Sequence, residues 1–218
     1  MFDSAESVEM TDVLPAKLPA HRPSRRQEII DAAIKVFART GFAETSVQDV
    51  ASEAGVVPTA VYYHFAGKDH LFDVVLQSVI AELDELVERA RPEVDDPAVA
   101  LPQITAAVWN WIESRPDHAQ ILYTHLPGAT EEARLLRVQF AEKHIERAFA
   151  YAGHAAGRRR LRSATAAQAA TRLAVRTLIG TLIAIQPMRL DGGPLSRRSP
   201  RALREALDEV TLRMLDLD

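Results

Sequence analysis

Apolar and polar residues recur along most of the chain with the period of an α-helix. The first clear apolar face carries Ile29, Ile30, Ala33, Val36 and Phe37. Charged residues occupy the opposite face of the same segment, so an amphipathic helix is predicted from residue 24. Gly41 is expected to end this helix, because glycine readily takes the left-handed conformation that closes a helix. Phe42 can then fold back onto the helix as the apolar partner of that turn.

A second, short helix is predicted in the segment TSVQD, which begins at Thr45. Two pairs of residues fit a capping signature equally well, Thr45 with Gln48 and Ser46 with Asp49. The sequence therefore predicts the helix start and leaves its capping residue open.

The next residues predict a tight turn between two short helices. Ala51 and Gly55 lie four residues apart among several valines, a spacing that lets the two helices cross closely. Gly55 can supply a positive φ in the turn. Pro58 can begin the second helix, because the missing N–H would have no partner in a first turn. This pattern is that of a helix-turn-helix.

The remaining helical stripes fall at residues 71–87, 98–112, 131–152, 165–188 and 201–215. Breaks rich in proline, glycine or charge separate them, at PEVDDP, ESRPD, LPGA and DGGPLSRRSP. The predicted fold class is therefore all-α. We expect a disordered polar tail at 1–23, a three-helix helix-turn-helix domain at 24–70, and a C-terminal helical bundle at 71–218.

Composition narrows the possible functions. The chain has 218 residues, no cysteine and a formal net charge of −4. The absence of cysteine excludes disulfides and thiolate chemistry, and it fits a cytoplasmic location. The most apolar run, LIGTLIAI at 178–185, is too short to span a bilayer, so no membrane is expected as a partner. Because the net charge is acidic, any DNA contact must come from a local patch.

The segment RQEIIDAAIKVFARTGFAETSVQDVASEAGVVPTAVYYHFAGKDHLF resembles the TetR family of transcriptional regulators, and the likeness extends over about residues 25–76. In that family a three-helix module binds DNA, and a larger helical domain binds a small molecule and dimerises. The resemblance implies a ligand-responsive repressor that binds a palindromic operator as a homodimer and is released by a small hydrophobic effector. The alternatives are an activator of the same family, and a helical binding protein without DNA contact.

The resemblance also implies which residues contact double-stranded DNA. Val57, Pro58 and Thr59 open the recognition helix and are expected to read bases, although only Thr59 can hydrogen-bond. Phosphate contacts are expected at Tyr63 and Lys68. For four further candidates a structural role fits as well, as capping for the first two and as packing for the others: Thr45, Ser46, Tyr62 and His64.

Candidate effector contacts gather in the middle helices of the second half. Large aromatic rings mixed with histidines fit a mostly apolar pocket that contains a few hydrogen-bonding groups. Packing in the core is an alternative explanation for any single one of these residues. The set is Trp109, Trp111, His118, Tyr123, His125, Phe140, His144 and Phe149. Arg176 would favour an anionic ligand group if its side chain entered the bundle.

No catalytic residue, metal site or cofactor is predicted. The chain lacks a phosphate-binding glycine loop, a cysteine nucleophile and a nucleophile elbow around a serine, so an enzyme is not expected. Its histidines are spaced too irregularly for a metal site.

Dimerisation is expected through the last two helices. An apolar stripe carries Leu203, Leu207, Val210, Met214 and Leu217. A matching face on the preceding helix carries Ala174, Leu178, Thr181 and Ile185. Internal packing of the bundle is the alternative explanation for both.

Overall fold

The computed structural model describes residues 24–91, 97–123, 130–156, 164–190 and 195–215. The predicted tail at 1–23 lies outside these residues. The described residues form nine α-helices and no strand, which confirms the all-α prediction. The helices are α1 (Arg25–Glu44), α2 (Val47–Glu53), α3 (Pro58–His64), α4 (Lys68–Ala90), α5 (Pro97–Ser114), α6 (Pro116–Tyr123), α7 (Glu131–Ala156), α8 (Ala164–Leu190) and α9 (Pro200–Leu215).

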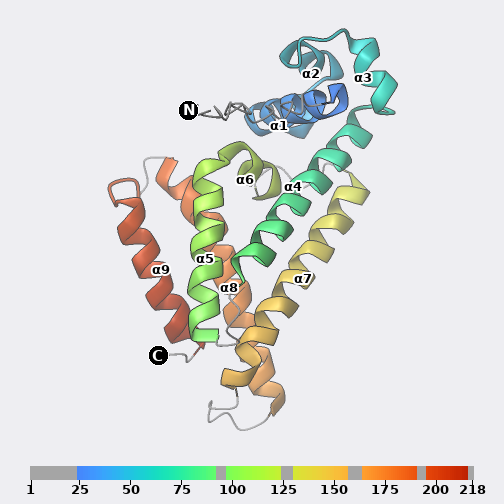
Figure 1. Ribbon diagram of the computed structural model, residues 1–218. Helices are drawn as coiled ribbons and strands as arrows, with labels where there is room; N and C mark the ends of the chain where they lie inside the picture. The colour runs from blue at the N-terminus through green and yellow to red at the C-terminus, as the bar shows by residue number, and fades with distance from the viewer. Residues whose placement is uncertain (1–23, 92–96, 124–129, 157–163, 191–194, 216–218) are drawn as a thin grey trace, which may run out of the picture.

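The first three helices form a small head at one end of the molecule (Figure 1). Helix α4 runs from this head into the bundle made by α5 to α9. The predicted boundary between residues 70 and 71 falls inside α4, and Phe72 packs against Phe37 and Phe42 of the head at 5.0 Å between ring centres in each case. Helix α4 therefore belongs to both parts and connects them directly.

The backbone breaks at Gly41, as the sequence predicts. Gly41 has φ 81° and ψ 166°, and a few helical residues follow it to Glu44. The Phe42 ring folds back against Phe37, with 6.1 Å between the ring centres. A residue with a Cβ would be strained at this φ.

The cap of α2 is Ser46, which settles the two alternatives left open by the sequence. The Ser46 hydroxyl accepts a hydrogen bond from the Asp49 N–H at 3.2 Å, and the Asp49 carboxylate accepts one from the Ser46 N–H at 2.8 Å. The hydrogen bonds from Ser46 lower the pKa of Asp49 below its ordinary value. Thr45 is buried instead, and its hydroxyl donates to the Gly41 carbonyl at 2.6 Å.

The turn between α2 and α3 has the predicted geometry. Gly55 has φ 64°, and the buried Ala51 accepts a hydrogen bond from the Val56 N–H at 2.9 Å. Helix α3 begins at Pro58, and its capping position is Val57, whose side chain makes no capping hydrogen bond. The buried Val61 then holds α3 against the head. These features confirm the helix-turn-helix.

Helix α6 is missing from the sequence prediction, which treats residues 113–130 as breaks around an unassigned stretch. The helix has only eight residues, too few for a convincing period, and it begins at Pro116. Its apolar residues Ala119, Ile121 and Leu122 are buried. It packs against α1 and α4, so it fills the space between the head and the bundle.

Candidate functional site

The first turn of α3 presents an almost apolar surface to solvent. Val57 is 64% exposed, Thr59 is also exposed, and Pro58 is half-buried between them. Their methyl and methylene groups, with the single hydroxyl of Thr59, are available for contact. This arrangement suits van der Waals contact with thymine methyl groups better than hydrogen-bonded reading of bases.

The last turn of α3 carries two exposed phenols. Tyr63 is 85% exposed, and its ring is perpendicular to the neighbouring His64 ring, at 5.0 Å between centres. Tyr62 is 53% exposed, and His64 lies half-buried between Tyr63 and Phe65. Both hydroxyl groups therefore reach solvent, where a phosphate oxygen could accept their hydrogen bonds.

Lys68, a predicted phosphate contact, has its ammonium bound to backbone carbonyls of the head. Its ammonium donates to the carbonyl oxygens of Phe42 at 2.9 Å and Ala43 at 3.2 Å. It also lies over the Phe42 ring, 4.5 Å from the centre. The carbonyls at the end of a helix carry partial negative charge and attract a cation. Lys68 therefore ties α4 to the end of α1.

Thr45 and Ser46 are also less available to DNA than the sequence suggests. The Thr45 side chain is buried, so its hydroxyl cannot reach a phosphate. The Ser46 hydroxyl and N–H both bond the Asp49 carboxylate, at 2.6 and 2.8 Å. Their side chains thus serve the packing and capping of the head, and contact with DNA through backbone N–H groups at the start of α2 stays a prediction.

Arg25 and Arg26 lie where the chain could reach DNA, although their sequence context favours a solvated charge pair. Arg25 pairs with Glu28 at 2.9 Å. Arg26 instead places its guanidinium 5.2 Å from the centre of the Phe65 ring. This brings a positive charge of α1 to the residue that follows the last turn of α3. No local pattern signals it, because Arg26 and Phe65 meet only in the folded chain.

The predicted effector residues whose side chains the structure describes lie in separate places in the bundle. Trp109 and Trp111 lie two residues apart on α5, so their side chains point about 200° apart around the helix axis. The side chains of Tyr123, the last residue of α6, and of Phe149 lie outside the described part of the structure. His125 lies outside it altogether. Arg176 is exposed on α8, so the condition for an anionic ligand group, entry of its side chain into the bundle, is not met.

One group of effector candidates surrounds Glu82 of α4. The Trp111 Nε1–H donates to this carboxylate at 3.0 Å, and His118 Nε2 lies 3.4 Å from its other oxygen. Arg115 adds a longer contact of 3.5 Å. Burial lowers the pKa of His118, although the charge of Glu82 opposes this. The group joins α4, α5 and α6 beneath the head.

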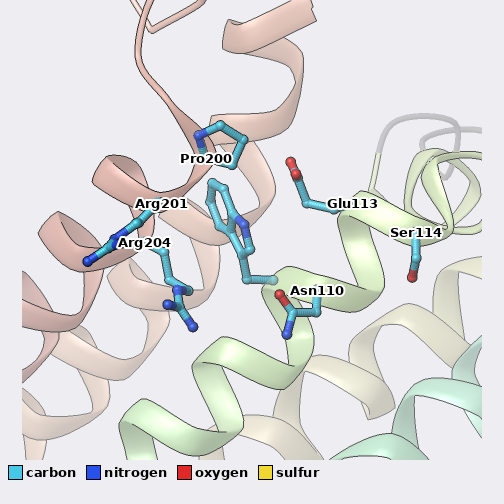
Figure 2. A pocket seen from close by; sticks show the side chains of 7 residues that line it. Asn110, Glu113, Ser114, Pro200, Arg201 and Arg204 are labelled. Atoms are coloured by element: carbon cyan, nitrogen blue, oxygen red, sulfur yellow. The ribbon is translucent and has the colours of Figure 1, made fainter.

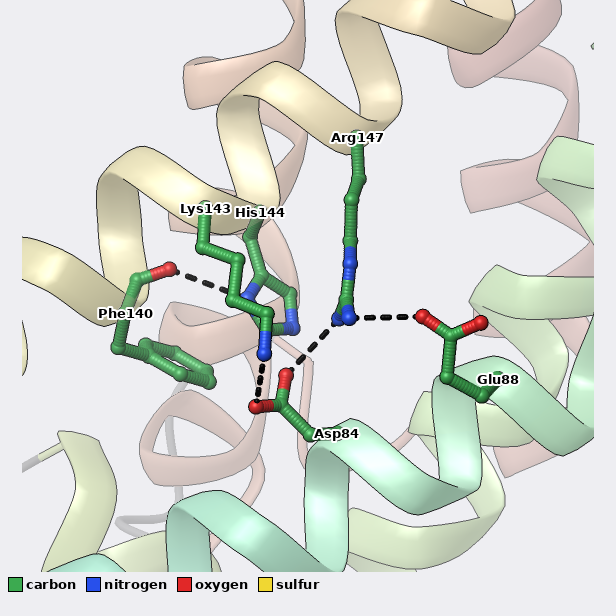
Figure 3. A network of polar contacts seen from close by, with 6 residues as sticks. All are labelled: Asp84, Glu88, Phe140, Lys143, His144 and Arg147. Atoms are coloured by element: carbon green, nitrogen blue, oxygen red, sulfur yellow. Dashed lines mark hydrogen bonds and ion pairs between the residues drawn. The ribbon is translucent and has the colours of Figure 1, made fainter.

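A second group lies between α7 and α4 (Figure 3). The rings of Phe140 and His144 are 4.1 Å apart between centres, and His144 Nδ1 is 3.1 Å from the Phe140 carbonyl oxygen. Asp84 of α4 binds Lys143 at 2.6 Å and Arg147 at 2.9 Å. Arg147 also binds Glu88 of α4 at 2.7 Å. We call these ion pairs of Asp84 and Glu88 with Lys143 and Arg147 the α4–α7 clamp.

Trp109 belongs to a third place, a surface pocket of about 520 Å³ between α5 and α9 (Figure 2). The pocket is lined by Trp109, Asn110, Glu113, Ser114, Pro200, Arg201 and Arg204. Two arginines of α9 face the acidic and amide side chains of α5 across it. It is separate from the clamp and from the Glu82 group.

A groove of about 570 Å³ lies between α8 and α9. It is lined by apolar and small side chains, namely Thr177, Gly180, Thr181, Ala184, Ile185, Leu195, Leu203, Ala206, Leu207 and Val210.

Several members of the predicted dimerisation stripes, such as Leu178 and Leu207, are buried inside the bundle. The exposed apolar side chains beside them are Leu173, at 70%, and Val210, at 47%. Leu217 lies outside the described residues.

Other kinds of site find little support in the described part of the chain. Within it, no group of three histidine or acidic side chains could hold a metal ion. None of its helices combines the length and the apolar character needed to cross a bilayer.

The family model and the curated relatives that match this chain all describe transcriptional regulators. Residues 29–75 match the family model described as bacterial regulatory proteins of the tetR family. The chain is 30% identical over 133 residues to the HTH-type transcriptional regulator BetI of Brucella anthropi, covering 59% of this chain and 68% of BetI. It is 30% identical over 99 residues to the HTH-type transcriptional repressor NicS of Pseudomonas putida, covering 45% of this chain and 47% of NicS. The match thus spans about half the length of NicS.

A solved structure shares the arrangement of helices over most of the chain. The transcriptional regulator FadR from Bacillus subtilis, solved in complex with stearoyl-CoA, aligns with a TM-score of 0.68. The alignment covers 85% of this chain and 96% of FadR at 18% sequence identity. At that identity the likeness concerns the arrangement of helices alone.

Proposed function

This chain belongs to the TetR family of bacterial regulatory proteins, and we propose that it is a repressor that binds a palindromic operator as a homodimer and leaves it when a small hydrophobic effector binds the bundle. The observation that carries the proposal is the helix-turn-helix itself. Its recognition helix α3 exposes Val57, Thr59, Tyr62 and Tyr63 on the outer end of the head. Exposed apolar and aromatic side chains on a recognition helix are typical of a surface that binds a partner, here DNA.

Each part of α3 has a different role in this proposal. Val57, Pro58 and Thr59 enter the major groove and read bases, chiefly through thymine methyl groups. Tyr62, Tyr63 and His64 contact the sugar-phosphate backbone, joined by Arg26 from α1. Lys68 supports them indirectly, because it fixes α4 and the end of α1 to each other.

The effector proposal is supported by the relatives and by the position of α4. FadR was solved with stearoyl-CoA, and NicS is named a repressor. In the present chain α4 joins the head directly to the bundle, where the Glu82 group and the α4–α7 clamp hold it. An effector that moves α4 changes the separation of the two recognition helices in a dimer. It must bind the DNA-free form more tightly to weaken operator binding.

The dimer proposal rests on the groove between α8 and α9. Leu173 and Val210 expose apolar surface beside it, and a second copy of the chain would cover both. A two-fold axis there would give each dimer two recognition helices for the two halves of a palindrome.

The test is binding of the full-length protein to DNA from upstream of its own gene, measured by fluorescence anisotropy with unrelated DNA as competitor. We expect specific retention that Thr59→Ala with Tyr63→Ala weakens at least tenfold, about 1.4 kcal/mol. Gln103→Ala, at an exposed position on α5, is the matched control and should bind like wild type. Equal affinity for upstream and unrelated DNA in wild type would contradict the proposal and favour a helical binding protein without DNA contact.

An activator of the same family would use the same recognition helix, so it differs only in its effect on transcription. A reporter gene behind the bound DNA separates the two, because deleting a repressor raises expression and deleting an activator lowers it. We propose no catalytic role for the chain.

A further inference from the structure

His144 lies on the face of α7 that meets α4, together with Phe140 and Arg147 (Figure 3). Its Nδ1 atom is 3.1 Å from the carbonyl oxygen of Phe140, one turn earlier on the same helix. A carbonyl oxygen can only accept a hydrogen bond. The hydrogen of this bond must therefore be on Nδ1 of His144.

The imidazole is also kept neutral by its surroundings. Burial lowers the pKa of His144, and the positive charges of Arg147 and Lys143 act in the same direction. The Phe140 hydrogen bond and the charge of Asp84 oppose these effects without cancelling them. A neutral ring with its hydrogen on Nδ1 has a bare lone pair on Nε2. The Nε2 atom is therefore a hydrogen-bond acceptor.

This acceptor is buried and lacks a donor. No described residue donates a hydrogen bond to His144 Nε2, although the atom is shielded from solvent. Buried polar atoms are normally paired, and an unpaired one destabilises the fold. The nearby cations Lys143 and Arg147 do not serve as donors to Nε2, because they bind Asp84 and Glu88.

We propose that His144 Nε2 is the polar anchor of the effector site and accepts a hydrogen bond from a neutral donor group of the effector, a hydroxyl or an amide N–H. This inference rests on the proposed function, since it assumes that the bundle binds an effector. The Phe140 ring packs against the imidazole, so the rest of the effector near the donor is apolar or aromatic. The ligand class is therefore alcohols, phenols and amides with a hydrocarbon body.

A carboxylate fits the same position poorly. Its oxygens carry only lone pairs, which would face the lone pair of Nε2 without a hydrogen between them. It would also lie close to Asp84, whose negative charge acts on the His144 ring. The anchor thus distinguishes a hydroxyl from its methyl ether, which lacks the donor, and from an acid, which is ionised at neutral pH.

The first experiment measures the tautomer directly in the full-length protein without any ligand. Nitrogen-15 NMR of histidine-labelled protein separates a protonated ring nitrogen from a bare one, and His144→Gln identifies the signal. We expect a hydrogen on Nδ1 and a bare Nε2 at neutral pH. A hydrogen on Nε2, or a doubly protonated ring, would overturn the proposal.

The second experiment uses three probes with the same body, 4-hexylphenol, 4-hexylanisole and 4-hexylbenzoate. We expect the phenol to bind about tenfold more tightly than the ether and the acid, and to shift the Nε2 signal. His144→Phe should abolish this preference, and His144→Gln should restore part of it because the amide oxygen accepts. His70→Gln, a histidine change at an exposed position at the start of α4, should leave the preference intact.

Equal binding of the phenol and the ether, or binding of no probe, would overturn the anchor. So would a preference for the phenol that survives in His144→Phe, provided that this variant melts cooperatively. Upstream DNA binding without probes is measured in the same preparations. If wild type binds that DNA specifically, failure of the probe experiment removes only the anchor, whereas loss of specific DNA binding removes the proposed function itself.

Discussion

The ammonium of Lys68 lies 2.9 Å from the carbonyl oxygen of Phe42 and 4.5 Å from the centre of the Phe42 ring. One cation thus joins the start of α4 to the segment that follows the backbone break at Gly41. The Phe42 ring in turn contacts Phe72, so the attachment of the head to α4 depends on this corner.

Lys68→Ala is expected to destabilise the protein. Loss of two charge-assisted hydrogen bonds at a partly buried position should lower the free energy of unfolding by roughly 1–2 kcal/mol. Urea unfolding followed by circular dichroism measures the change, and Lys35→Ala, on the exposed side of α1, is the control. An unchanged free energy of unfolding, with a shallower salt dependence of DNA binding, would return Lys68 to the phosphate contacts.

The apolar first turn of α3 should make DNA recognition sensitive to thymine methyl groups. Replacing thymine by uracil should weaken wild-type binding at one or two positions of each half-site, by about 1 kcal/mol per contact. Thr59→Ala should reduce the preference at a single position. Anisotropy titrations at two salt concentrations measure both effects. Uracil without effect at every position would rule out methyl reading.

Leu173→Asp together with Val210→Asp should yield a monomer. Both side chains are exposed in the single chain, so the change spares the bundle core, and it places charges in an apolar contact between copies. Sedimentation velocity measures the mass. Val138→Asp, which alters an exposed apolar position on α7, is the matched control. Leu207 is unsuitable for this purpose because it is buried within its own bundle. A double variant that stays dimeric would place the interface elsewhere.

The stability of the protein should fall below about pH 6.5 because of two histidines. Burial lowers the pKa of His118 and of His144 from the ordinary value of 6.5. Above that value both rings are neutral in the folded and unfolded states, so they add no pH dependence. Below it the unfolded chain binds protons that the folded chain excludes, and unfolding becomes easier until the pH reaches the lowered pKa.

Urea unfolding across this pH range measures the effect, and His118→Gln with His144→Gln should flatten the dependence above the range in which carboxylates titrate. Each single variant should remove part of it. A double variant with the same pH dependence as wild type would show that other groups are responsible.

Asp84→Asn should weaken the α4–α7 clamp and so loosen the position of α4. It removes the charge that pairs with Lys143 and Arg147, both of which remain. We expect a loss of about 1 kcal/mol in the free energy of unfolding and a several-fold loss in operator affinity without effector. Glu85→Gln, which breaks only the exposed pair with Arg89, is the control. Equal operator affinity in Asp84→Asn and wild type would mean that the clamp does not set the position of α4.

The sequence by itself determined the local structure of the head. The break at Gly41, the turn at Gly55 and the start of α3 at Pro58 follow from backbone conformations that few other residues allow. The long helices also follow from their apolar period. These signals act between residues a few positions apart, so they can be interpreted before the fold is known. These local signals did not decide whether Thr45 or Ser46 caps α2.

Only the tertiary structure decided which faces of these helices are covered. It buries Thr45, turns Lys68 inward, exposes Arg176 and sends Trp109 and Trp111 to different sides of α5. It also stabilises α6, which is too short to be recognised by its period. The physical reason is that burial depends on contacts with distant segments. The periodicity of a helix shows which of its side chains are apolar or charged. Which other helix these side chains contact depends on how the helices pack.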